Sequence, residues 1–127
     1  MNEIELQALD SITNKITTYL ECLKTQLTMA LDKQTSLNGS AFSMYLGNVI
    51  NLENILSYEL QRYGSTGSEN EMEVYKSLQE VIDYGNHIVK MNDFQYDEGH
   101  FNRIISFINV INDNELNRYI FNSLPSV

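Results

Sequence analysis

The chain has 127 residues, with 17 acidic and 8 basic side chains and a formal net charge of −9. This length suits one hydrophobic core, so we expect residues 1–127 to form a single domain. The negative charge argues against direct binding of DNA or RNA, whose phosphates require a basic surface, and equally against binding to an anionic membrane. It permits a basic protein partner, although acidic surfaces also serve solubility alone.

No apolar run approaches the length of a membrane span, and Glu3 and Glu5 stand where a signal peptide would be basic. We therefore expect a cytoplasmic protein. Secretion by a machinery that requires no cleavable signal peptide remains an alternative. The single Cys22 cannot form an internal disulfide and is interpreted as a buried, inert thiol. The 15 asparagines fit an AT-rich gene of the kind common in phages and mobile elements.

The first predicted element is a long helix over residues 3 to 33, about 45 Å long at the rise of an α-helix. Apolar residues recur in it every eleven positions, or three turns at about 3.67 residues per turn, which predicts a nearly straight stripe. The repeats are Leu9, Leu20 and Leu31, then Ile12 and Leu23, then Ile16 and Leu27.

A second helix is predicted after the turn-forming run 34–39, with Ser40 as its cap and Gly64 at its end. Its apolar positions are spaced by three and four: Phe42, Leu46, Val49, Leu52, Leu56, Leu60 and Tyr63. A third helix carries an inner face of Met72, Tyr75, Leu78, Val81, Ile82, Ile88 and Val89. Gly85 falls on that face and indicates either close helix packing or a bend.

Residues 92–99 are predicted to form a loop before a fourth helix. That helix carries Phe101, Ile104, Ile105, Ile108 and Ile111 on one face. Asn112, Asp113 and Asn114 are expected to break it, with a short fifth helix bearing Leu116, Tyr119, Ile120 and Leu124 before Pro125. No segment alternates as a strand does. The pattern predicts an all-α, four-helix antiparallel bundle with a long first helix and a short terminal one.

Catalytic and metal-binding residues are scarce. A nucleophile and base pair would need Cys22 next to His87 or His100, and no motif surrounds any of them. The loop 93–99 resembles a calcium loop only superficially, because its sixth position is Glu98 instead of glycine and its twelfth is Ile104 instead of glutamate. We therefore expect no enzyme activity, no metal and no cofactor.

A helix-turn-helix over residues 40–63 is also disfavoured. Its only base is Arg62, against the acids Glu53 and Glu59, so a recognition helix would meet phosphates with the wrong charge.

The remaining candidate site is an acidic surface on the third helix and the loop after it. Its predicted partner-binding residues are Glu69, Glu71, Glu73, Glu80, Asp83, Phe94, Tyr96, Asp97 and Glu98. Only Lys76 offsets the charge on the outer side of the helix, and Asp93 extends the acidic surface into the loop. The alternative is a solvated helix face. Tyrosine and phenylalanine favour binding sites, but Phe94 and Tyr96 could equally pack over the end of the bundle.

The sequence thus favours a small acidic protein-binding module that inhibits or sequesters a protein partner, such as an immunity protein or a phage-type inhibitor of a nucleic-acid-binding protein. The alternative is a helical chaperone or assembly component. It would pair through its long first helix, where Ile4, Leu6 and Met29 widen the apolar stripe, and a homodimer is left open.

Overall fold

The part of the chain that the structure describes contains four helices of known bounds: α1 (Glu3–Lys33), α2 (Gly39–Arg62), α3 (Glu69–Lys90) and α4 (Glu98–Asp113). The computed structural model describes residues 3–62, 69–114 and 116, with the side chains of α3 described from Glu73 onward. Over these residues the protein is helical with no strand, as the sequence predicts. The expected fifth helix lies outside the described residues except for Leu116, which is buried.

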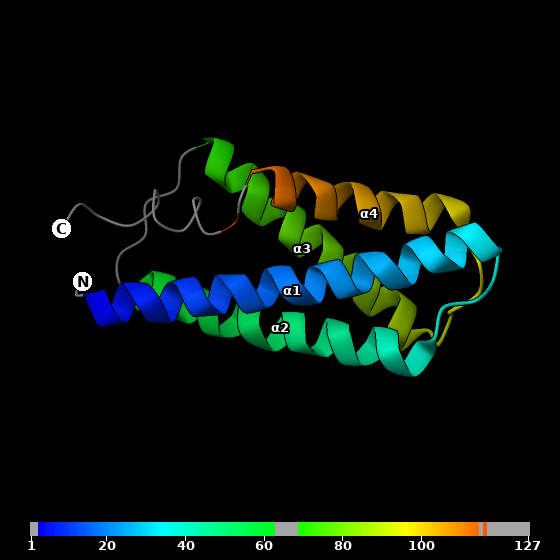
Figure 1. The fold of residues 1–127 in the computed structure, drawn as a ribbon, viewed down its shortest axis with the longest axis horizontal. Coiled ribbons are helices and arrows are strands. Elements are labelled where there is room, and N and C mark those ends of the chain that lie inside the picture. The colour runs from blue at the N-terminus through cyan, green and yellow to red at the C-terminus, as the bar shows by residue number, and fades with distance from the viewer. Residues whose placement is uncertain (1–2, 63–68, 115, 117–127) are drawn as a thin grey trace.

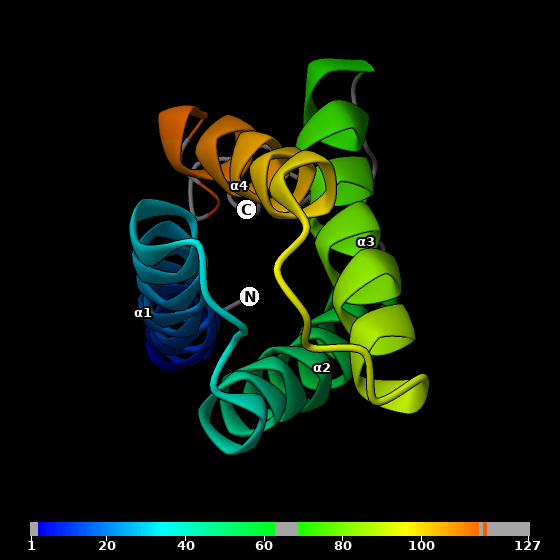
Figure 2. The same cartoon turned by 90° about the vertical axis from the view of Figure 1, so that its right-hand side faces the viewer.

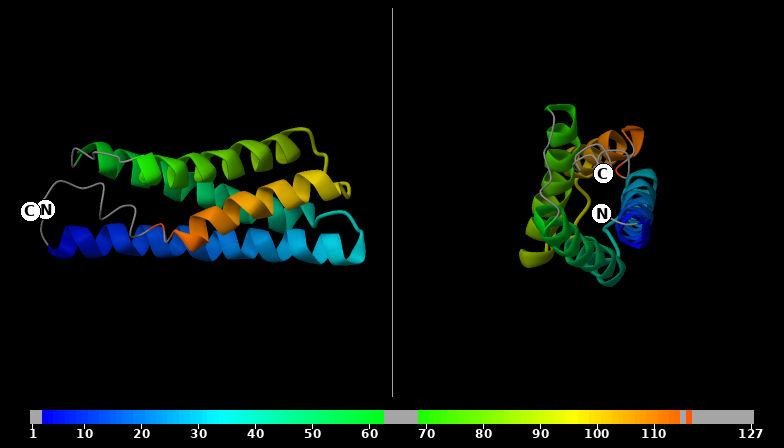
Figure 3. Two further views of the ribbon diagram at one scale, coloured as in Figure 1. Left: turned by 90° about the horizontal axis from the view of Figure 1, so that it is seen from above. Right: turned by 90° about the vertical axis from the view of Figure 1, so that its left-hand side faces the viewer.

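Successive helices run in opposite directions (Figure 1). Each helix packs against the next one in the chain, and α4 returns to pack against α1. Seen end-on, the four helices therefore surround a common core, with α3 inclined to the others (Figure 2). The view from above shows α4 lying along the second half of α1 (Figure 3).

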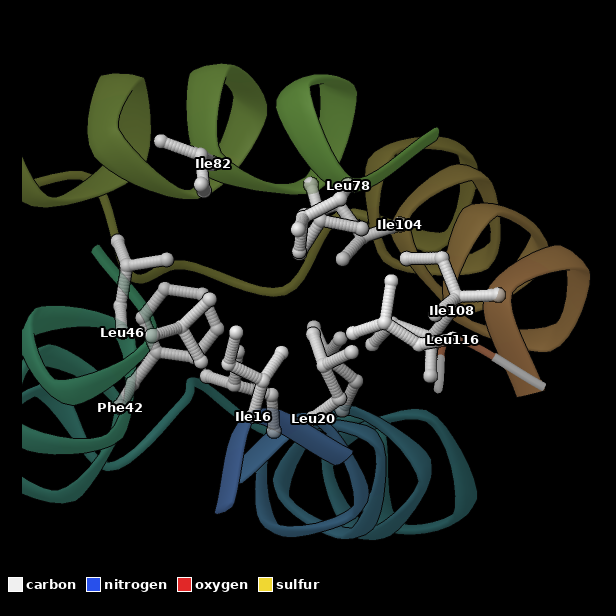
Figure 4. Packing of buried hydrophobic residues seen from close by; sticks show 14 of the residues in the cluster. Ile16, Leu20, Phe42, Leu46, Leu78, Ile82, Ile104, Ile108 and Leu116 are labelled. Carbon is white, nitrogen blue, oxygen red and sulfur yellow. The ribbon is translucent and has the colours of Figure 1, made fainter. Parts of the chain in front are cut away.

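The core is apolar and receives side chains from all four helices. Ile16 and Leu20 of α1 point toward the same space as Phe42 and Leu46 of α2, Leu78 and Ile82 of α3, and Ile104 and Ile108 of α4 (Figure 4). Most of these side chains are fully buried, so apolar burial is the main source of stability.

The buried residues of α1 follow a seven-residue period, which differs from the eleven-residue stripe that the sequence suggested. They are Leu9, Thr13, Ile16, Leu20, Leu23, Leu27 and Ala30, with alternating steps of four and three. Leu31 and Ile12 are only partly buried. A period of about 3.5 residues per turn is the one that keeps a helix seam facing its neighbours in a bundle.

The third helix packs closely on α2 at Gly85. Close packing was one of the two alternatives predicted for this glycine, the other being a bend. A Cβ atom on Gly85 would stand 2.9 Å from Cδ1 of Leu46 on α2. The sequence missed Val74, which is buried beside Leu78, whereas Tyr75 and Val89 are only partly buried.

Helices α1 and α3 end in the same hydrogen-bonding pattern. Thr35 donates its backbone N–H to Ala30 and Gln34 to Leu31, while Asp93 donates to Ile88 and Asn92 to Val89. This is the Schellman motif, with Gln34 and Asn92 at positive φ. The motif turns the chain sharply into the two connections at this end of the bundle.

The cap of α2 differs from the prediction. The side chain of Asn38, and not that of Ser40, accepts the free backbone N–H of Ala41 at 3.1 Å. The cap of α4 is an acidic residue of the preceding loop: the Asp97 carboxylate accepts the backbone N–H of His100 at 3.0 Å.

Candidate protein-binding surface

The acidic residues of α3 project from the outer side of the bundle. Glu73 and Asp83 are exposed and Glu80 is partly exposed. Glu69 and Glu71 lie in the first turn of α3, and their side chains fall outside the described part of the chain. Asp93, Asp97 and Glu98 are exposed in and after the loop that follows.

A shallow hollow of about 430 Å³ lies between α3 and α4 beside these acids. It is lined by Glu73, Lys76, Ser77, Glu80, Tyr84, Arg103 and Phe107, which we call the α3–α4 groove. The groove is therefore not purely acidic, because Arg103 of α4 joins Lys76 there. No pattern in the sequence places Arg103 beside the acids, because only the packing of α4 on α3 brings them together.

Tyr84 is the aromatic centre of this groove. Its ring stacks on Phe107 at a centroid distance of 5.9 Å and an interplanar angle of 21°. The Arg103 guanidinium donates a hydrogen bond to its hydroxyl at 2.9 Å, and the ring of His100 lies 5.9 Å away. Contacts with α4 thus hold Tyr84 in one position. A side chain that is already fixed loses little conformational entropy when a partner binds.

The two loop aromatics of the predicted site pack inward. Phe94 lies edge-on to Phe42 at 6.5 Å, and a Cβ on Gly39 would meet its ring at 3.0 Å. Tyr96 lies edge-on to Phe101 at 6.1 Å. Both rings are partly buried against the core, which is the alternative that the sequence left open.

Asp97 also has a structural partner. Besides capping α4, its Oδ2 lies 3.4 Å from Nδ1 of His100, which is an ion pair only when the imidazole is protonated, and both side chains are exposed. Exposed ion pairs contribute little to stability, so the cap is the more important of the two contacts.

The thiol of Cys22 is partly exposed, which corrects the buried position expected from the sequence. It lines a second hollow of about 420 Å³, between α1 and α2, together with Thr17, Thr18, Glu21, Thr25, Gln26 and Tyr45. Neither His87 nor His100 lines this hollow. In the part of the chain that the structure describes, no group of three or more histidine, cysteine or acidic side chains is arranged to hold a metal.

A second surface feature, not predicted from the sequence, lies on α2. Between Gly39 and Tyr58 the only charged residue is Glu53, which is buried. Met44, Ile55 and Tyr58 are large apolar side chains that remain exposed on this helix. The scarcity of charge over most of the helix was readable in the sequence, but only the fold shows that these three side chains remain exposed.

The long first helix offers less. Ile4 and Met29 are exposed on it, whereas Leu6 is partly buried. Ile4 and Met29 are about 37 Å apart along the axis, and Ser11, Thr18 and Thr25 occupy the same side between them. They do not form a continuous apolar seam.

Comparisons with protein-family models, curated proteins and solved structures give no match to this chain. Among the described residues, none of the helices combines the length and the apolar character that crossing a membrane requires.

Proposed function

We propose that the chain is a non-enzymatic, cytoplasmic protein-binding module that inhibits or sequesters a basic protein partner, in the manner of an immunity protein or a phage-type inhibitor of a nucleic-acid-binding protein. The observation that carries the proposal is the α3–α4 groove, where the fixed ring of Tyr84 lies beside the carboxylates of Glu73 and Glu80. Tyrosine and arginine are enriched at binding hot spots, and charged residues are typical of the rim around them.

The proposed mechanism has two parts. The exposed acids of α3 and of residues 93–98 steer a basic surface toward this side of the bundle, which raises the association rate at low ionic strength. A lysine or arginine of the partner then enters the α3–α4 groove, where the carboxylates of Glu73 and Glu80 pair with it and the ring of Tyr84 supplies an apolar contact. Occupying such a basic surface would block its access to nucleic acid.

The test is affinity capture from host extract on immobilised protein, with washes at low and high salt. The double variant Glu73→Lys/Glu80→Lys should lose the captured partner while helicity measured by circular dichroism stays unchanged. The control is Glu3→Lys/Asp32→Lys, which changes the net charge equally but on exposed positions of α1. Equal capture by both variants would contradict the acidic-surface mechanism.

A second candidate is a helical assembly or chaperone component, favoured by the exposed Ile4 and Met29 of α1. A contact of this kind would rest on apolar burial and would survive the high-salt wash. Salt-resistant capture that is lost in a Met29→Glu variant would support it, and salt-sensitive capture unaffected by that change would exclude it.

A further inference from the structure

The exposed side of α2 has an unusual composition for this acidic chain. We define the α2 outer face as Met44, Gly47, Asn48, Asn51, Ile55 and Tyr58, which share the side of the helix opposite its buried residues. Met44, Ile55 and Tyr58 are 55%, 49% and 66% exposed. No charged residue lies among these positions, although the whole chain has a net charge of −9. The face is uncharged and carries three large apolar side chains, within an otherwise acidic chain.

Gly47 has no reason for being glycine within the monomer. It lies in the middle of a helix, where glycine is less favourable than alanine, and a Cβ there would meet no heavy atom within 4 Å beyond its chain neighbours and the adjacent backbone of its own helix. Glycine at an exposed helix position allows the backbone of a second helix, or a large side chain from it, to approach closely. The absence of a Cβ thus points to a contact outside this chain.

The α2 outer face is self-complementary about Asn51. Met44 and Tyr58 each lie seven residues from Asn51, on either side, and Gly47 and Ile55 each lie four residues from it. In an antiparallel pair of α2 helices related by a two-fold axis at Asn51, Met44 of one copy meets Tyr58 of the other. Ile55 then lies over Gly47, a large side chain against an empty position, and the two Asn51 amides face each other on the axis.

We propose that the α2 outer face binds a second copy of this chain in an antiparallel, two-fold symmetric dimer centred on Asn51. A two-fold contact uses the same patch on both subunits, and the pairs Met44 with Tyr58 and Gly47 with Ile55 supply such mirror positions. The proposal does not depend on the function proposed above, because it concerns a different side of the bundle.

Charge also favours a second copy over other occupants. Two molecules that each carry −9 repel one another, and a contact that opposes like charges is strongly disfavoured. The neutral α2 outer face lets two copies meet without opposing carboxylates. A paired asparagine at the axis fixes the register, because only that register gives both amides a partner. A basic partner would gain nothing from a face without acids.

A single pair of helices forms a small interface, so the dimer is weak, with a dissociation constant in the micromolar range. Salt screens the repulsion between the two acidic molecules while leaving the apolar contact intact, so association strengthens as salt is added. This salt dependence is opposite to that of the acidic surface on α3 with a basic partner, so the two proposals can fail separately.

The first experiment is sedimentation velocity on the full chain over a range of concentrations at low and high salt. The wild type should form a concentration-dependent dimer that salt strengthens. Asn51→Asp places two carboxylates on the axis and should weaken dimerisation at least about tenfold. The matched control Asn102→Asp adds the same charge at an exposed position of α4 and should leave dimerisation unchanged. A strictly monomeric wild type, or equal effects of the two changes, would overturn the proposal.

Two further variants distinguish a loss of dimerisation from a loss of monomer folding. Gly47→Ala should weaken the dimer yet raise the melting temperature of the dilute monomer, because a Cβ has space within the monomer but not under Ile55 of the second copy. In a Cys22→Ser background, Asn51→Cys should form an intermolecular disulfide much faster than Asn102→Cys, because only residue 51 meets its own copy. A lower melting temperature for Gly47→Ala, or equal disulfide rates, would contradict the two-fold arrangement.

Discussion

The Tyr75 hydroxyl on α3 donates a hydrogen bond to the carboxylate of Glu53 on α2, which is only 8% exposed. Gln79 donates a second hydrogen bond to the same Oε1 atom at 2.9 Å. Glu53 occupies a position of the seven-residue pattern where the other inward residues of α2 are apolar. A carboxylate can be buried only when hydrogen bonds replace its hydration, so this polar contact helps to fix how α2 and α3 meet.

Tyr75→Phe should destabilise the protein by about 1–3 kcal/mol, because the buried carboxylate of Glu53 loses a hydrogen-bond donor. Urea denaturation followed by circular dichroism gives the free energy of unfolding. Tyr58→Phe is the matched control, because Tyr58 is exposed and its change should leave stability within error. Equal stability of wild type and Tyr75→Phe would show that the contact with Glu53 adds nothing.

The same contact predicts a pH dependence. Burial first, and then the hydrogen bond to Glu53, raise the pKa of Tyr75 from 10.0 to about 12. A raised pKa in the folded state contributes stability that is complete below the unfolded value of 10.0 and is lost as the pH rises toward about 12. The free energy of unfolding should therefore fall over this range, and Tyr75→Phe should flatten the fall. Absorbance titration of the tyrosinates, as a difference between wild type and variant, would give the pKa directly.

The helices could be predicted from the sequence because large apolar residues recur at helical spacing. The predicted first helix, residues 3–33, agrees with α1. The inward positions were harder to assign where the residue is small or polar. Thr13 can be buried because its hydroxyl donates a hydrogen bond to the backbone oxygen of Asp10. Glu53 can be buried because Tyr75 and Gln79 donate hydrogen bonds to its carboxylate. Such partners lie elsewhere in the chain or in the fold, so hydropathy favours the neighbours Ile12 and Leu52 instead.

The candidate surface was predictable only in its charge. The acids of α3 are visible in the sequence, and Glu73 and Asp83 are exposed as a solvated or binding face requires. The position of Arg103 next to Tyr84, and the packing of Phe94 against Gly39 of α2, come from contacts between different elements of the fold. No local pattern contains that information.

Two glycines should respond to alanine with opposite signs. Gly85→Ala brings a Cβ to 2.9 Å from the buried Leu46, so overpacking should outweigh the gain in helix propensity and cost about 1 kcal/mol. Gly47→Ala has open space and should stabilise the monomer by about 0.5–1 kcal/mol. Thermal unfolding of the two variants at low concentration measures both. An increase in stability for both variants would mean that the close packing at Gly85 is easily relieved.

Phe94→Ala should destabilise the protein by about 2–4 kcal/mol, because the ring fills the space between Gly39 and Phe42 and joins the two connections at this end of the bundle. The backbone N–H of Leu37 donates a hydrogen bond of 2.8 Å to the backbone oxygen of Phe94, and in the variant this amide proton should exchange faster with solvent. Hydrogen exchange of Leu37 measures this. If stability were unchanged while capture of the partner was lost, Phe94 would instead act as a binding residue, as the sequence suggested.

Asp97 allows the helix cap to be separated from the acidic surface. Asp97→Asn keeps an oxygen that accepts the backbone N–H of His100 and removes the charge, so stability should change by only a few tenths of a kcal/mol. Asp97→Ala removes both and should cost about 1 kcal/mol of folding stability. Denaturant titration ranks the two variants, and capture of the partner at low salt then shows what the charge does. Equal weakening of capture in both would assign Asp97 to the binding surface, whereas capture lost only in Asp97→Ala would assign it to helix capping alone.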